Sequence, residues 1–172
     1  TGVEISELYD SMSQYPTHIS SPEYKKYITQ QRDVEAKESD YKWSAGDTIR
    51  TAIGQSYNNY TSALMSKYVA TLANGGTRYS MHFLNKITTN DGKIEEEYQP
   101  KVESKIEIKK ENLDAIFRGM FLVTTGPRGT LRSYFKDFPV NVAAKSGTAQ
   151  QSSKRSEHTT FVAFAPLEDP QI

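Results

Sequence analysis

VNVAAKSGTAQQ, residues 140–151, is the stretch of this chain that says most about its fold. It opens on a short apolar run of the kind that forms a buried strand. Lys145 follows directly, and a Lys is costly to bury unless it is paired or used in chemistry. Gly147 lets a ligand approach the backbone closely, and Ser146 and Thr148 place hydroxyl groups beside it. These residues suit a site for an anion or an acyl group. They equally suit a strand end that runs into a polar turn.

The composition fits one domain of ordinary size, with 172 residues. The 21 basic residues balance the 21 acidic ones, so the charge gives no support to a nucleic-acid partner. The absence of Cys excludes disulfides, thiol catalysis and Cys-based zinc sites. Within these 172 residues we find no signal-peptide pattern and no apolar run of about 18 residues that predicts a membrane span. Both ends of the chain look cut.

Two helices are predicted from apolar residues at three- and four-residue spacing. The first covers residues 61–74, with Thr61 as N-cap and a Gly-Gly pair as its stop. The second covers residues 112–124, with Asn112 as N-cap. The expected core faces are Leu64, Met65, Tyr68, Val69 and Leu72 in the first helix, and Leu113, Ile116, Phe117, Met120 and Phe121 in the second.

Strands are predicted in two places. Residues 77–98 contain two strands joined by the hairpin signal Asn90-Asp91-Gly92. Residues 139–148 and 158–165 form two further strands, rich in residues that favour β-structure. The segment between the two pairs, residues 99–111, is predicted to be a charged connection.

Three other features of the sequence give little evidence of a catalytic or binding site. Residues 1–42 are polar and predict loops with one short helix around residues 22–37. The loop at 126–130, GPRGT, is Gly-rich but lacks the spacing and the Lys of a phosphate-binding P-loop. The histidines share no ligand spacing, so they are interpreted as surface or hydrogen-bonded residues rather than metal ligands; they are His18, His82 and His158.

Five short blocks are more informative together than any one motif. They are WSAGDT at 43–48, AIGQ at 52–55, YT at 60–61 opening a helix that ends in ATLANGG at 70–76, KSGTAQ at 145–150, and FVAFAP at 161–166. In this order and rough spacing they closely resemble the C-terminal half of the transpeptidase domain of class B penicillin-binding proteins. The opening Thr1-Gly2-Val3 resembles the T-G-[IV] that precedes this region in the family.

The family has three active-site motifs, S-x-x-K, S-x-N and K-[ST]-G, and the resemblance implies that this chain carries only the third. Look-alikes of the first two begin at Ser39, Ser133 and Ser56. We reject them, because the chemistry needs a nucleophile at a buried helix start, one turn from a desolvated Lys. Ser39 lies in a charged stretch, Ser133 lies just before a predicted strand, and Ser56 follows the A-I-G-Q block.

The resemblance implies an α+β fold, an antiparallel sheet with helices on its faces, of the penicillin-binding and serine β-lactamase-like type. It is expected here only as a partial domain that does not fold stably alone. Within residues 1–172, we expect residues 1–42 to be a polar, loop-rich segment. Residues 43–172 are expected to supply helices and sheet strands, including the K-S-G-T strand.

The resemblance also implies acyl transfer through a Ser that lies outside this chain. Lys145 and Thr148 are the expected catalytic residues: Lys145 supplies positive potential near the nucleophile, and the Thr148 N–H is one of two oxyanion-hole donors. Ser146 and Thr148 are expected to bind the substrate's terminal carboxylate. Gly147 leaves room for the substrate along the strand, and Gln150 lines the cleft. The loop at 126–130 is given a supporting role only.

No cofactor and no metal are implied. The expected partners are a peptidoglycan stem peptide ending in D-Ala-D-Ala, β-lactam antibiotics, the missing N-terminal part of the same domain, and cell-wall synthesis or division proteins, with no nucleic acid. The expected location is the outer face of the bacterial cytoplasmic membrane, with an N-terminal helix outside this chain as the anchor. The alternatives are a β-lactam-sensing receptor domain, a non-catalytic scaffold of the same fold and, less favoured, a serine β-lactamase.

Overall fold

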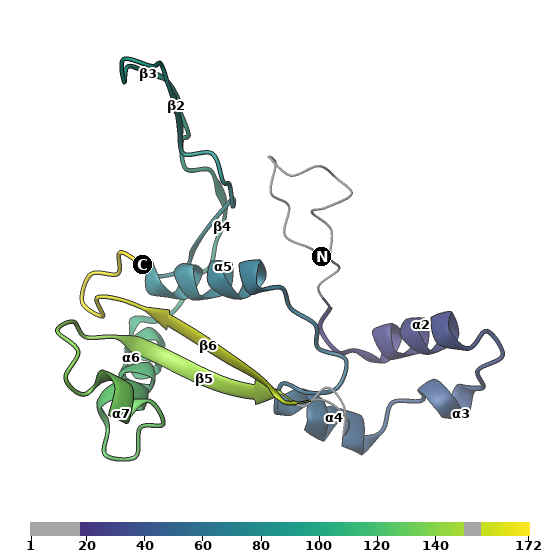
Figure 1. The fold of residues 1–172 in the computed structure, drawn as a ribbon. Helices are drawn as coiled ribbons and strands as arrows, with labels where there is room; N and C mark the ends of the chain where they lie inside the picture. Colours follow the sequence, from purple (N-terminus) through teal and green to yellow (C-terminus); the bar gives the residue numbers. More distant parts are fainter. Residues whose placement is uncertain (1–17, 150–155) are drawn as a thin grey trace. The chain divides into compact units, whose positions relative to one another are not determined.

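The computed structural model describes residues 18–149 and 156–172, which fall into two compact units (Figure 1). The first is built mainly from residues 18–61, and the second from residues 62–147 and 159–172. Each unit has its own helices and its own internal hydrogen bonds, which are described in turn.

Three helices make up most of the first unit: α2 at Pro22–Arg32, α3 at Glu38–Tyr41 and α4 at Ala45–Ala52. Ser21 caps α2 by accepting a hydrogen bond from the backbone N–H of Tyr24 at 3.1 Å. A Pro at the first helical position is favourable because its fixed φ suits a helix start. The predicted start of this helix is confirmed.

The prediction that the same helix extends to residue 37 is wrong. It ends at Arg32, because Asp33 has an extended backbone with φ −143° and ψ 106°. The Asp33 carboxylate accepts the backbone N–H of Glu35 at 3.0 Å. A side chain that pairs with nearby backbone in this way competes with the helix.

Helix α4 forms where apolar spacing predicts no helix, and its first turn explains why. The Ser44 hydroxyl accepts the backbone N–H of Asp47, and the Asp47 carboxylate accepts the backbone N–H of Ser44, at 3.2 and 2.8 Å. Lys25 of α2 donates to the same carboxylate at 2.8 Å. Asp47 is fully buried, and these hydrogen bonds make a buried charge tolerable.

A turn after α4 holds Ser56 in a left-handed conformation with φ 71°. Residues other than Gly adopt this region at a cost of roughly 1–2 kcal/mol. The Ser56 hydroxyl is also buried without a hydrogen-bond partner among the described residues. Both features predict that this residue destabilises the turn.

We therefore expect Ser56→Gly to raise the free energy of unfolding by about 1 kcal/mol. Scanning calorimetry of the full-length protein that contains this chain measures the gain. Ser66→Gly is the matched control, because residue 66 lies inside the helix Ser62–Ala73, where Gly is unfavourable. A loss of stability in both variants would contradict the assignment of strain to Ser56.

In the second unit, helix α5 spans Ser62–Ala73, as its apolar spacing predicts. Gly75-Gly76 follows, and both residues have positive φ. A Cβ on Gly76 would lie 2.2 Å from the carbonyl oxygen of Ile106, so the predicted Gly-Gly stop is confirmed. The expected core face is wrong at Tyr68, which is 57% exposed. Spacing marks an apolar stripe, but the elements packed on it decide which members are buried.

The buried side of α5 also holds an unpredicted charge. Lys67 is almost fully buried and forms an ion pair with Glu103. Arg78 donates to the other oxygen of the same carboxylate at 3.0 Å. Because the pairing removes the cost of an isolated charge, a Lys is tolerated in this interior position.

Four short strands follow α5 as two antiparallel pairs (Figure 1). In the first pair, β1 at Thr77–Tyr79 lies against β4 at Val102–Lys105. In the second, β2 at Lys86–Thr88 lies against β3 at Ile94–Glu97. The predicted turn at Asn90-Asp91-Gly92 joins β2 to β3 and is confirmed.

Two predictions for this region are wrong. Residues 77–98 hold three strands rather than two, and residues 99–111 include β4 rather than being only a connection. The sequence of β4, VESK, has no alternating apolar residues. Its strand structure depends on the pairing with β1, which apolar spacing does not reveal.

Helix α6 spans Lys110–Thr125 and begins before the predicted residue 112. Lys109, and not Asn112, occupies the N-cap position, so that prediction is wrong. Gly126 is the C-cap, which confirms the predicted end of the helix. A short helix, α7 at Arg132–Phe135, follows before the next strand.

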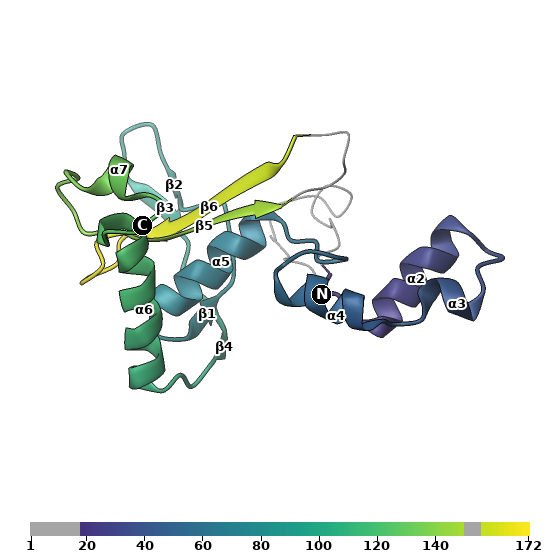
Figure 2. The ribbon, with the colours of Figure 1, turned by 90° about the horizontal axis from the view of Figure 1, so that it is seen from below.

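Strands β5 at Ala143–Ala149 and β6 at His158–Phe164 form an antiparallel pair (Figure 1). The two predicted strands are present, but the predicted start of the first at residue 139 is wrong, because β5 begins at Ala143. Helices α5 and α6 lie beside this pair of strands (Figure 2). Side chains of both helices and both strands form the hydrophobic core. The rings of Phe117 on α6 and Phe164 on β6 lie 4.9 Å apart, centre to centre. Val69 and Ala143 complete the buried centre.

The described part of the chain is an α+β fold with small antiparallel sheets and helices, as predicted. Over residues 18–149 and 156–172, no helix is both long and apolar enough to cross a membrane. The division between residues 42 and 43 stays a prediction.

Candidate active site

Strand β5 carries the K-S-G-T residues out of the hydrophobic core. Ala143-Ala144 is fully buried, whereas the next residue, Lys145, is exposed. The buried hydroxyl of Thr124, near the end of α6, donates to the carbonyl oxygen of Val142 at 2.7 Å. This hydrogen bond fixes the start of the strand on the helix, so the position of Lys145 is set by the core.

Lys145 and Ser146, the first two residues of the K-S-G-T motif, each make a polar side-chain contact. The Lys145 Nζ donates to the carbonyl oxygen of Ser146, which leaves N–H groups of the ammonium for other acceptors. The Ser146 hydroxyl lies 3.2 Å from the hydroxyl of Thr130. The loop at 126–130 is therefore in direct contact with the motif.

Gly147 is the closest point between β5 and its partner strand. The Thr160 hydroxyl donates to the Gly147 carbonyl oxygen at 3.3 Å. A Cβ on Gly147 would lie 2.9 Å from that hydroxyl oxygen, so only Gly fits without a shift. Among the described residues, β5 pairs with β6 alone, which leaves its other edge able to accept an extended peptide.

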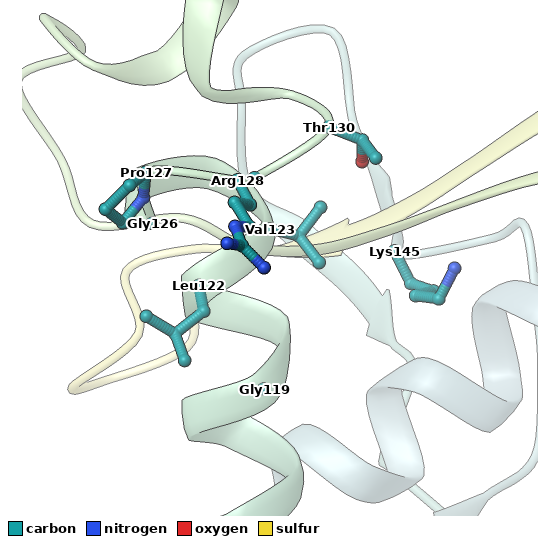
Figure 3. A pocket seen from close by; sticks show the side chains of 9 residues that line it. Gly119, Leu122, Val123, Gly126, Pro127, Arg128, Thr130 and Lys145 are labelled. Atoms are coloured by element: carbon teal, nitrogen blue, oxygen red, sulfur yellow. The ribbon is translucent and has the colours of Figure 1, made fainter.

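An open pocket of about 460 Å³ lies beside Lys145. It is formed by the last turns of α6, the loop at 126–130 and Lys145 itself (Figure 3). In this view Arg128 lies over the end of α6, and Lys145 lies on the far side of Val123. The pocket therefore combines an apolar wall with two cationic side chains.

The structure places four of the predicted site residues on one strand: Lys145, Ser146 and Gly147, followed by Thr148, which is exposed. Gln150 and the opening Thr1-Gly2-Val3 lie outside the described residues. The loop at 126–130, for which a supporting role is expected, contacts the motif through the hydroxyls of Thr130 and Ser146. No sequence spacing predicts this contact, and the Gly-Thr pair in the loop is the local feature that points to it.

The three look-alike serines have surroundings unlike those of a serine nucleophile. Ser39 is exposed on the four-residue helix α3, and its hydroxyl donates to Asp40 at 3.2 Å. Ser133 is exposed on α7, which corrects its expected place just before a strand. Ser56 lies in the strained turn after α4.

The histidines make ordinary contacts. The His18 ring stacks on Tyr24 with centres 3.9 Å apart, and the His82 ring stacks on Tyr98 at 3.4 Å. His158 begins β6 and is exposed. Within the part of the chain that the structure describes, no three His, Cys, Asp or Glu side chains gather in a way that could hold a metal ion.

Comparison with known proteins identifies the family of this chain. The model of the penicillin-binding protein transpeptidase domain matches residues 22–172. The chain belongs to this family. The peptidoglycan D,D-transpeptidase MrdA of Escherichia coli strain K12 is 33% identical over 155 residues, which cover 82% of this chain and 24% of MrdA. The class B resemblance of the sequence is thereby confirmed.

Solved penicillin-binding proteins share the fold. PBP2 of Pseudomonas aeruginosa is 29% identical with a TM-score of 0.68, over 95% of this chain and 33% of that one. PBP2 of Helicobacter pylori, in a complex with MreC, has a TM-score of 0.62 at 21% identity, over 92% of this chain and 26% of that one. The chain thus spans about a quarter to a third of the length of these penicillin-binding proteins.

Proposed function

We propose that the protein containing this chain is a peptidoglycan D,D-transpeptidase that works through a serine acyl-enzyme. The Ser attacks the penultimate D-Ala carbonyl of a stem peptide and expels the terminal D-Ala. An amino group of a neighbouring stem then attacks the ester, releases the Ser and closes the cross-link. Penicillins imitate the D-Ala-D-Ala end and stop at the acyl-enzyme. Family membership supports this proposal.

The observation that carries the proposal is the exposed K-S-G-T strand with one edge unpaired among the described residues. A peptide aligned along this edge would meet the Thr148 N–H, which we assign as one oxyanion-hole donor. Preorganised donors of this kind stabilise the negative charge that develops on the carbonyl oxygen. Lys145 supplies positive potential at the same place.

The other motif residues are assigned to substrate binding. Ser146 and Thr148 bind the terminal carboxylate through their hydroxyl groups, and the contact between Ser146 and Thr130 supports a fixed orientation for the Ser146 hydroxyl. Gly147 is assigned to leaving room for the substrate along the strand. A Cβ at this position would lie 2.9 Å from the Thr160 hydroxyl oxygen, so a larger residue would require that side chain to shift. Gln150 is assigned to the continuation of the cleft.

The nucleophile is assigned to a part of the protein outside this chain. None of the three look-alike serines has a hydrogen bond to a Lys among the described contacts. A serine nucleophile needs such a base within reach. We therefore assign the S-x-x-K and S-x-N motifs to the missing N-terminal part of the same transpeptidase domain.

Exposed apolar side chains support the proposal that this chain is part of a larger domain. Ile49 and Ile53 on and after α4 are 65% and 70% exposed, and Val34 is 90% exposed. Large apolar side chains that are this exposed are expected where another segment of the domain covers them. We propose that residues 1–42 form the loop-rich start of this chain's part of the domain, and residues 43–172 its sheet and helix region.

Partners and location follow from the family in the same way. We propose that the protein acts at the outer face of the bacterial cytoplasmic membrane, held by an N-terminal helix outside this chain. Cell-wall synthesis or division proteins are its proposed partners, and the PBP2–MreC complex of Helicobacter pylori supports this class of partner.

Turnover by the full-length protein tests the function. The purified protein is incubated with a synthetic donor peptide ending in D-Ala-D-Ala and an acceptor amine, and D-Ala release and the cross-linked product are followed. We expect both products, and we expect penicillin to abolish them. Acylation by penicillin without turnover would favour a receptor domain, and an absence of acylation would favour a scaffold.

A further inference from the structure

The pocket beside Lys145 contains a second cationic side chain, Arg128, which has no role in the function proposed above. Arg128 and Lys145 both line the pocket, and among its described lining residues there is no carboxylate. The Arg128 side chain is exposed and makes no ion pair among the described residues. A fork of unpaired guanidinium N–H groups is suited to binding a carboxylate in two-point geometry.

The loop that carries Arg128 is held against the end of α6. The Gly129 N–H donates to the Gly126 carbonyl at 2.8 Å, and the Leu131 N–H donates to the Val123 carbonyl at 3.0 Å. A Cβ on Gly129 would lie 2.5 Å from the Val123 carbonyl oxygen. The loop backbone therefore packs directly against the end of α6, with no room for a side chain at residue 129. Arg128 is therefore presented on a fixed backbone, which favours specific recognition.

The remaining wall of the pocket is apolar. Leu122, Val123 and Pro127 line it, and Figure 3 shows the Arg128 side chain beside Val123, over the end of α6. An aliphatic chain that ends in an anion matches this surface better than a compact anion does. The aliphatic part contacts the wall while the charged end reaches the guanidinium.

We propose that Arg128 binds a carboxylate on a side chain of the peptide substrate, next to the scissile D-Ala-D-Ala end. This inference rests on the proposed transpeptidase function and adds a specificity-determining residue to it. The terminal carboxylate is a different group, because it is assigned to the hydroxyls of Ser146 and Thr148 on β5. Arg128 belongs to a different element, the loop that follows α6, and Figure 3 shows Arg128 and Lys145 on opposite sides of Val123.

The test compares two synthetic peptides in the full-length protein. Both end in D-Ala-D-Ala, and they differ only in the preceding residue, whose side chain ends in a carboxylate or in a carboxamide. We expect the wild type to favour the carboxylate peptide by about tenfold in kcat/KM. We expect Arg128→Gln to remove this preference while the acylation rate by penicillin, which lacks that side chain, stays within about twofold.

Arg118→Gln is the matched control, because Arg118 is exposed on α6 and does not line the pocket. It should keep the tenfold preference. If the preference for the carboxylate peptide survives Arg128→Gln, the inference is wrong. The inference is also wrong if Arg128→Gln lowers the rates with both peptides and with penicillin equally, because that result would assign Arg128 to the terminal carboxylate. A wild-type protein that penicillin does not acylate at all would contradict the proposed function itself. This result differs from those that contradict only the role of Arg128, so the two can be distinguished.

Discussion

Lys145→Ala is expected to slow acylation of the full-length protein by penicillin by about 10²- to 10³-fold. Lys145 lies at the point where β5 leaves the core, is exposed, and lines the pocket. Removing it takes away positive potential where negative charge develops, and nothing nearby on the strand replaces it. Stopped-flow acylation with a fluorescent penicillin measures the rate.

Lys136→Ala is the matched control for this experiment. Lys136 is the C-cap residue of α7, its side chain is half exposed, and it does not line the pocket. We expect its acylation rate to stay within about twofold of the wild type. Circular dichroism on both variants confirms that the protein is folded. A Lys145→Ala rate equal to that of the control would remove Lys145 from the proposed machinery.

Asp47→Asn is expected to lower the melting temperature at pH 7 by on the order of 10 °C. Lys25, Ser44 and Arg50 all donate to this fully buried carboxylate. The substitution removes the negative charge and leaves the mostly buried Lys25 ammonium without its counter-ion. Scanning calorimetry of the full-length protein measures the change.

The effect of Asp47→Asn should also depend on pH. The hydrogen bond from Lys25, followed by those from Ser44, holds the pKa of the Asp47 carboxyl well below its usual range. A depressed pKa in the folded state stabilises the protein above the unfolded-state pKa of about 4, and this contribution is lost as the pH falls toward the folded pKa. The difference between wild type and variant should therefore shrink below about pH 4.

Asp137→Asn provides the control, because its side chain is 87% exposed. Its melting temperature should follow that of the wild type at every pH. An Asp47→Asn variant that melts like the wild type at pH 7 would show that the hydrogen bonds to the Asp47 carboxylate contribute nothing to stability. A difference that persists unchanged at pH 3 would show that the effect does not depend on the carboxylate charge.

The apolar helices and the hairpin could be predicted from the sequence because their signals are local. The spacing in α5 and α6 and the turn at Asn90-Asp91-Gly92 are visible within a few residues. The start of α4 was equally local, since Ser44 and Asp47 form a readable capping box. It was missed because apolar spacing was given priority over polar caps.

Other features depend on residues far apart in the chain. Lys67 is buried because Glu103, 36 positions away, pairs with it, and no local pattern announces such a partner. Strand β4 exists through its pairing with β1. In the candidate site, the K-S-G-T strand was predictable from its motif, whereas the contact of Thr130 with Ser146 depends on a loop that folds back over α6.

The most direct test of the account is to locate the serine that penicillin acylates in the full-length protein. The acylated protein is digested, and mass spectrometry identifies the peptide that carries the drug. We expect the drug on a serine outside these 172 residues, within an S-x-x-K sequence. We expect no drug on any peptide from these 172 residues. A label on Ser39, Ser56 or Ser133 would contradict the central claim that this chain supplies the K-S-G-T strand and not the nucleophile.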